Sequence, residues 1–185
     1  MKNSILILLL FISCTSYAQF VEGQGFCIAS EDKSYFPLGL NEKKIFWADT
    51  HYTETKLGTQ EIEGKIYVTF QQKWKNNATD ALYLREENGV VYQYEDCCET
   101  ETVRFNPNFK VGHVWKTADG MGTYEVITYD GKFKTPFCNY ENLMVIKATL
   151  QGGTFEFYYQ RGHGYVGASV NNQIISCVTP TLEMD

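Results

Sequence analysis

The segment QYEDCCETE, residues 93–101, gathers side chains that could do chemistry: Cys97 and Cys98 stand among the acids Glu95, Asp96, Glu99 and Glu101. Zinc sites usually take cysteines from spaced pairs, often with histidine, whereas carboxylates are hard ligands suited to other ions. A thiol becomes reactive when a positive neighbour lowers its pKa, and these neighbours are acids. The segment therefore predicts no metal site, no cofactor and no catalytic thiol.

A second candidate for chemistry is the segment ADTHYTE, residues 48–54. Alternation of side chains along an extended chain would place Asp49 and His51 on one face, and an Asp–His pair can orient a general base. Glu54, Glu61 and Glu63 could act on glycosides only if folding brought two carboxylates within about 5–10 Å. The sequence has no Gly-x-Ser-x-Gly or His-Glu-x-x-His motif. A secreted hydrolase of the glycosidase or esterase type is therefore the alternative prediction, and no catalytic residue is assigned.

The first residues are typical of a secretory signal. Lys2 precedes an uninterrupted apolar run at 5–12, and small residues at 16–18 favour cleavage before Gln19. We predict a signal peptide over residues 1–18. The protein would then be exported to the periplasm or the cell exterior.

A lipid anchor is the other possibility at this end of the chain. Residues 11–14 loosely resemble a lipobox, in which Cys14 would carry the lipid.

The apolar run is shorter than the roughly 20 residues that span a bilayer, and no later stretch is long enough, so no membrane span is expected. Residues 19–185 are predicted to form a single domain.

Five cysteines follow the predicted signal peptide: Cys27, Cys97, Cys98, Cys138 and Cys177. In an oxidising compartment disulfides are the default for such residues. We predict a Cys27–Cys177 bridge between the two ends of the domain, and a bridge from Cys97 or Cys98 to Cys138. An odd number leaves one thiol over.

The elements that must position these residues are strands. In residues 65–74, 142–150 and 153–161 apolar side chains alternate with polar ones, which is typical of half-buried strands in an antiparallel sheet. No stretch carries the apolar stripe of a helix. The sequence predicts an all-β fold of roughly ten to twelve strands, in which an antiparallel meander forms a curved sheet, an open barrel or a sandwich.

Three turn signals separate the predicted strands. Asn88-Gly89, Asp130-Gly131 and Gly152-Gly153 each supply residues that accept the positive φ of a tight hairpin. The second of these predicts a hairpin between strands at 122–129 and 132–137. The spacing of the three signals indicates a meander.

Aromatic residues make up 15% of the chain. Most would serve packing, because aromatic side chains favour pleated, half-buried surfaces. A ligand face, formed by Tyr158, Tyr159 and Tyr165 near the end of a sheet, is the functional alternative.

Two stretches carry a family resemblance: NPNFKVGHVWKT at 106–117 and KTPFCNYENLMVIKATLQGGTFEFYYQRGHGYVGASV at 134–170. They are similar to the TapB-like family of uncharacterised exported β-rich proteins, mainly over residues 106–170. The resemblance implies an all-β exported domain with no established activity. It also implies that Gly162 and Gly164 are structural turn residues. His163 and Cys138 depart from the family pattern, so neither inherits a role.

Charge and composition exclude several functions. The formal net charge is −6 and no cluster of Lys or Arg is denser than Lys43-Lys44, so nucleic acid is not an expected partner. The sequence predicts a non-catalytic binding or structural role in the cell envelope or outside the cell. The partner would be a small molecule such as a lipid, a glycan, or another envelope protein.

Overall fold

The computed structural model describes residues 27–30 and 34–179. The predicted signal peptide and Cys14 lie outside these residues. The strands are β1 (Glu42–Trp47), β2 (Thr50–Ile62), β3 (Lys65–Trp74), β4 (Thr79–Glu87), β5 (Val90–Glu95), β6 (Thr100–Phe105), β7 (Val114–Lys116), β8 (Thr123–Lys134), β9 (Asn139–Leu150), β10 (Gly153–Gln160), β11 (Gly164–Val170) and β12 (Gln173–Thr179). No helix in this part of the chain has the length and apolarity needed to cross a membrane.

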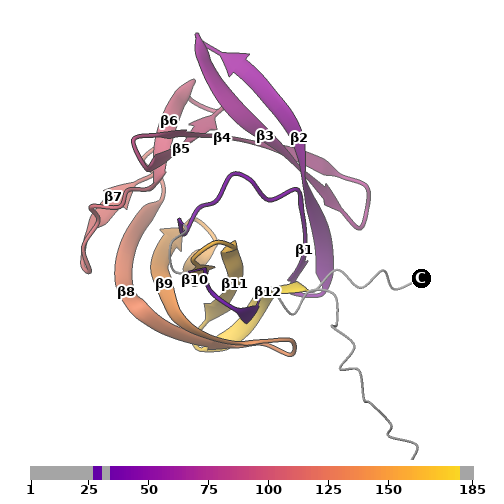
Figure 1. Cartoon of the computed structure of the whole chain (residues 1–185), viewed down its shortest axis with the longest axis vertical. Coiled ribbons are helices and arrows are strands. Elements are labelled where there is room, and N and C mark those ends of the chain that lie inside the picture. Colours follow the sequence, from indigo (N-terminus) through magenta and orange to yellow (C-terminus); the bar gives the residue numbers. More distant parts are fainter. Residues whose placement is uncertain (1–26, 31–33, 180–185) are drawn as a thin grey trace, which may run out of the picture.

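All twelve strands belong to one antiparallel sheet, in the order β6-β5-β4-β3-β2-β1-β12-β11-β10-β9-β8-β7. The sheet curls round until its edge strands β6 and β7 approach each other, giving a nearly closed barrel (Figure 1). First and last strands pair directly, with Ile45 opposite Val178. The predicted all-β antiparallel fold is confirmed, and of the predicted architectures the structure adopts the open barrel.

Side chains bridge the seam between β6 and β7, where no ladder of backbone hydrogen bonds connects the two strands. The indole Nε1 of Trp115 donates a 2.7 Å hydrogen bond to the carbonyl oxygen of Val103. Just beyond β7, the amide of Ala118 donates a 2.8 Å bond to the buried hydroxyl of Thr102. The first bond pairs a backbone carbonyl on the edge strand β6, and the second pairs a side-chain hydroxyl on the same strand.

Two of the three predicted hairpins are confirmed. Asn88 and Gly89 take φ of +53° and +80° between β4 and β5, and Gly152-Gly153 separate β9 from β10. The hairpin predicted at Asp130-Gly131 is wrong, because β8 runs through both residues. Neither has a positive φ. The pairing with β9 instead shifts register on each side of Gly131, which marks a bulge within a continuing strand.

The sheet is buried on both faces over part of its width. Inside the barrel the main core includes Phe70, Leu84, Val91, Tyr124 and Ile146. A second core lies on the outer face of the sheet. There the C-terminal part of β8 and the N-terminal part of β9 pack against β10 and β11. It contains Phe133, Cys138, Tyr140, Leu143, Val145, Tyr158 and Val166.

The segment before β1, residues 34–41, crosses the interior of the barrel (Figure 1). Tyr35 is 4% exposed and packs near Phe105 and Tyr129, with ring centroids 6.1 and 5.7 Å away. The amide of Gly162 donates a 2.8 Å hydrogen bond to the Ser34 carbonyl. This segment therefore forms part of the interior rather than a tail outside the sheet.

Candidate functional site

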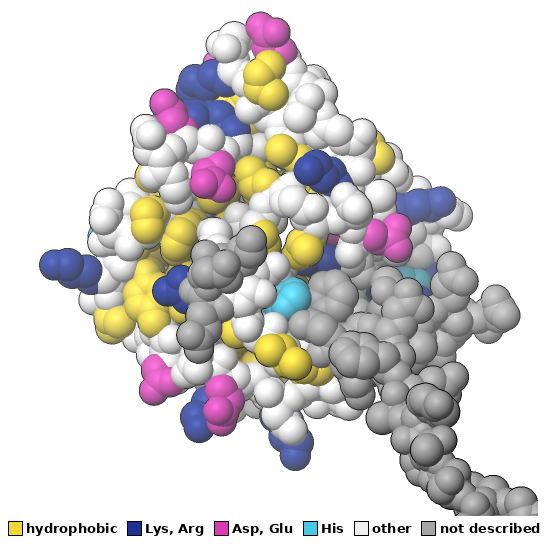
Figure 2. Space-filling view, viewed as in Figure 1, with side chains coloured by type: hydrophobic (Ala, Val, Ile, Leu, Met, Phe, Trp, Pro, Cys, Tyr) yellow, Lys and Arg dark blue, Asp and Glu magenta, His cyan; other side chains and the backbone are white. Residues whose placement is uncertain are grey.

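A cavity of about 200 Å³ lies inside the barrel. One wall is the segment before β1, and the others are β1–β6, β10 and β11. Its lining residues are Phe36, Pro37, Leu38, Leu40, Glu42, Lys43, Ile45, Trp47, Tyr52, Glu54, Phe70, Gln72, Leu82, Leu84, Gln93, Arg104, Phe157, Tyr159, Gly164 and Tyr165. In the view of Figure 2, hydrophobic side chains gather mainly left of the centre of the molecule, and most charged side chains lie nearer its outline.

Aromatic rings make up much of the cavity wall. Phe36 stacks on Tyr159 with centroids 4.5 Å apart, and on Phe105 at 5.7 Å. Tyr52 packs against Trp74 at 4.6 Å. Burial raises the pKa of Tyr52 and of Tyr159, so both phenols are neutral at ordinary pH. This part of the wall is apolar with a few uncharged hydroxyl groups, and a mainly apolar lining with a few polar groups is typical of small-molecule sites.

A row of three polar side chains crosses one wall. Lys43, Glu54 and Gln72 are register partners on β1, β2 and β3, so their side chains share the face that lines the cavity. The amide Nε2 of Gln72 donates a 2.8 Å hydrogen bond to Oε2 of Glu54. Burial lowers the pKa of Lys43, and the nearby Glu54 carboxylate opposes that shift.

Arg104 brings a second cation to the cavity from β6, on another side of the ring of strands. Its Nη1 donates a 3.1 Å hydrogen bond to the hydroxyl of Tyr124, and its guanidinium lies over the same ring at 5.3 Å. The side chain is only partly buried in the structure. The nearby guanidinium also opposes the rise in the pKa of Tyr159 that burial causes.

A second hollow of about 260 Å³ lies on the other side of Tyr35 and Phe105. It is lined by eight residues, against twenty for the cavity. Arg161 at its edge places its guanidinium 4.6 Å from the Tyr35 ring. Because fewer side chains enclose this hollow, the cavity is the better candidate for holding a ligand.

The structure separates the three tyrosines that were predicted to form a ligand face. Tyr159 and Tyr165 line the cavity. Tyr158 points to the opposite face of the sheet, where it stacks on Phe133 at 4.2 Å and its hydroxyl donates a 2.8 Å hydrogen bond to Glu156. Tyr158 therefore belongs to the outer core.

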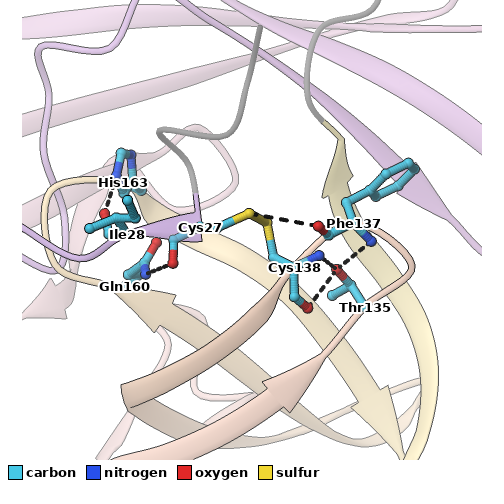
Figure 3. Close-up of a disulfide and its surroundings, with 7 residues drawn as sticks. All are labelled: Cys27, Ile28, Thr135, Phe137, Cys138, Gln160 and His163. Atoms are coloured by element: carbon cyan, nitrogen blue, oxygen red, sulfur yellow. Dashed lines mark hydrogen bonds between the residues drawn. A yellow bond between two sulfur atoms is a disulfide. The ribbon is translucent and has the colours of Figure 1, made fainter. Parts of the chain in front are cut away.

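The disulfides differ from the predicted pairing. Cys27 is bonded to Cys138, with Cα atoms 5.3 Å apart (Figure 3). The predicted Cys27–Cys177 bridge is wrong, because Cys27 is bonded to Cys138 while Cys177 lies opposite Phe46 in the β1–β12 ladder. The Cys177 thiol is free and buried, and burial raises its pKa.

Cys97 and Cys98 are bonded to each other in the turn between β5 and β6. The predicted bridge from Cys97 or Cys98 to Cys138 is therefore also wrong, because Cys138 is bonded to Cys27. Both cysteines are exposed together with Asp96 and Glu99, whereas Glu101 turns to an ion-pair network on the outer face. Within residues 27–30 and 34–179 no group of three His, Cys, Asp or Glu side chains is arranged to hold a metal ion.

The β10–β11 turn holds the start of the described chain. Gly162 and Gly164 have φ of +82° and +71°, a conformation that glycine adopts without strain. Between them, His163 Nε2 lies 2.9 Å from the carbonyl oxygen of Ile28, and Gln160 Nε2 donates a 3.4 Å bond to the Cys27 carbonyl (Figure 3). The turn and the disulfide together anchor the chain before it enters the barrel.

The residues proposed for hydrolysis are not assembled into a site. Asp49 lies in the β1–β2 turn, and His51 packs edge-on against Phe46 at 5.9 Å. In the described structure no hydrogen bond or ion pair joins Asp49 to His51, and neither lines the cavity. Glu61 and Glu63 lie at the β2–β3 turn, away from Glu54 in the cavity.

The sequence analysis did not predict that Lys43, Arg104 and Phe36 would line a cavity. A signal for Lys43 was present, because it alternates with Ile45 and Trp47 and so shares their inward face. No comparable signal exists for Arg104, whose inward position depends on how β6 closes the barrel.

No family model and no curated protein matches the sequence. Among solved structures, the chain is similar to a presumed exported protein with a YmcC-like fold from Bacteroides fragilis, with 10% sequence identity and a TM-score of 0.44. The match covers 80% of this chain and 97% of that one. A likeness of this size supports no functional conclusion. The resemblance to the TapB-like family stays a prediction.

Proposed function

We propose that this chain is an exported, non-catalytic binding domain that holds a small, largely apolar molecule inside its barrel. The observation that carries the proposal is the cavity, whose walls are largely aromatic and aliphatic side chains from positions between 36 and 165. Its volume of about 200 Å³ is below the roughly 300–1,000 Å³ of drug-sized sites. The ligand is therefore small, or it extends through the mouth of the cavity.

Export rests on two features of the chain. The predicted signal peptide directs it out of the cytoplasm, and the Cys27–Cys138 disulfide is a bond that persists in oxidising compartments.

The distribution of aromatic rings favours an interior ligand over a glycan on the surface. Among the described residues, the large hydrophobic side chains that are exposed include one aromatic, Phe137. Sugar binding on a sheet face needs several exposed rings, and here Tyr158, Tyr159 and their neighbours are packed against other side chains.

A neutral fluorescent probe tests the proposal. Titration with N-phenyl-1-naphthylamine should give saturable binding with one site per chain. Leu82→Trp adds a ring to the cavity wall and should weaken binding at least tenfold. Leu57→Trp, at a side chain that is 61% exposed, is the matched control and should bind like the wild type.

Thermal melting of both variants checks that they are folded. Absence of saturable binding by the wild type, or equal binding by folded Leu82→Trp, would show that the cavity is not a ligand site.

A further inference from the structure

We infer that the ligand of this cavity carries an acidic head group, which is held between Lys43 and Arg104 while its apolar part lies among the aromatic rings. The inference rests on the proposed function and names the chemical class of its ligand. It is a small amphiphilic acid, such as a medium-chain carboxylic acid.

Lys43 is the first observation. The residue is 8% exposed, and an isolated ammonium group removed from water to this degree is costly unless an anion compensates it. A Cβ atom at Gly164 would lie 3.2 Å from Lys43 Nζ and 3.2 Å from Pro37 Cδ. The ammonium therefore sits close to the backbone at the start of β11, next to the segment that crosses the barrel.

The neighbouring carboxylate does not neutralise Lys43 by direct contact. Glu54 lies opposite Lys43 in the β1–β2 register, yet its Oε2 accepts the hydrogen bond from Gln72. No salt bridge in the described part of the chain includes Lys43. A buried cation with room beside it and no ion-pair partner is a preformed place for an external anion.

Arg104 is the second cation. Its hydrogen-bond partners in the structure are the hydroxyls of Tyr124 and Tyr159, and no described carboxylate forms an ion pair with it. A guanidinium has five N–H donors and can bind a carboxylate in a bidentate manner, through two parallel hydrogen bonds. Arg104 thus keeps donors for a head group, and it stays charged at any physiological pH.

The carboxylates that line the cavity do not cancel the attraction of Lys43 and Arg104 for an anion. Glu42 is exposed at the mouth, where its Oε2 accepts a 3.4 Å hydrogen bond from Thr55 and water screens its charge. Inside the cavity Glu54 is then the one lining acid beside two lining cations, Lys43 and Arg104. The interior therefore favours one added negative charge over a neutral or cationic head.

Three ligands with the same ten-carbon chain test the inference by isothermal titration calorimetry: decanoate, decan-1-ol and decylamine. We expect decanoate to bind at least tenfold more tightly than decan-1-ol, and decylamine to bind most weakly. Lys43→Met and Arg104→Met should each reduce decanoate affinity at least fivefold and leave decan-1-ol affinity unchanged. Lys44→Met, at the adjacent β1 position outside the cavity lining, is the matched control.

The outcomes separate the inference from the proposed function. Equal binding of decanoate and decan-1-ol, or equal loss of both in Lys43→Met, overturns the acidic head group and leaves the cavity as a ligand site. Absence of binding by all three ligands, together with a negative result for the neutral probe, overturns the proposed function itself. Because Arg104→Met also removes the bond to Tyr124, Lys43→Met is the decisive variant if Arg104→Met does not fold.

Discussion

The ring of Phe36 stacks on the ring of Tyr159, with centroids 4.5 Å apart and planes inclined by 26°. Phe36 precedes the first strand and Tyr159 lies on β10, so this contact fixes the segment before β1 inside the barrel. The same segment supplies one wall of the cavity. The binding site proposed here therefore depends on how firmly that segment is held.

The Cys27–Cys138 disulfide should contribute strongly to stability. It joins residues 111 positions apart, and closing a loop of that length in the unfolded chain is worth about 4–5 kcal/mol. We expect Cys27→Ser with Cys138→Ser to lower the free energy of unfolding by that amount in urea titrations. The neutral probe should also bind more weakly, because residues 34–41 lose their anchor.

The vicinal pair provides the control for this measurement. Cys97 and Cys98 are one residue apart, so their bond closes almost no loop, and replacing both by serine should change stability by less than about 0.5 kcal/mol. An equal loss in the two double variants would mean that the long-range bridge does not hold the fold in the way described.

Glu101 should make stability depend on pH in the acid range. A hydrogen bond from Arg85 is the main reason that the pKa of Glu101 falls to about 2, from 4.5 for the free side chain. Lys65 Nζ and the Tyr67 hydroxyl also bond this carboxylate, at 2.8 and 2.7 Å. Because the pKa is lower in the folded state, the stabilisation is present above about pH 4.5 and is lost as the pH falls towards 2.

We expect Glu101→Gln to reduce the free energy of unfolding by about 1–2 kcal/mol at pH 7, a figure lowered for partial exposure to solvent. The wild type and the variant should converge near pH 2. Glu61→Gln, at an exposed position on β2, should behave like the wild type at every pH. Urea titrations at pH 7, 5 and 3 make the comparison, and a gap between Glu101→Gln and wild type that stays constant with pH would contradict it.

Trp115 should hold the seam of the barrel. Its indole bond to Val103 joins β7 to β6, which share no backbone ladder. Trp115→Phe keeps an aromatic ring but removes the donor, and leaving a partly buried carbonyl unpaired costs about 1–3 kcal/mol. Amide hydrogen exchange should accelerate in residues 100–105 and stay unchanged in β10 and β11. Uniform acceleration in all strands would indicate general destabilisation instead of an opened seam.

Gly167 should tolerate no side chain. A Cβ atom there would lie 2.5 Å from the carbonyl oxygen of Ser176 and would also collide with the ring of Phe133. We expect Gly167→Ala to lower the free energy of unfolding by about 1–3 kcal/mol, as for other overpacked positions. Gly39→Ala is the control, because nothing lies within 4 Å of its Cβ position. Equal melting temperatures for the two variants would show that β11 and β12 can move apart.

Local patterns were sufficient to predict the strands but not how they fold over one another. Alternation in residues 65–74 and 153–161 placed β3 and β10 correctly, because the side-chain period of a strand is a local property. The Asp130-Gly131 signal failed because the same residues also suit a bulge, and continued pairing with β9 decides between the two. That pairing is a tertiary contact.

The sequence by itself determined the all-β class, the antiparallel pairing and two of the hairpin turns, because periodicity and φ preference act over a few residues. Only the tertiary structure decided which cysteines pair and which tyrosines meet the cavity. Alternation says that Tyr158 and Tyr159 face opposite ways, but both faces of β10 are buried once β8 and β9 cover the outer one. That Lys43 and Arg104 line one cavity likewise required closure of the barrel, which brings β1 and β6 to one interior.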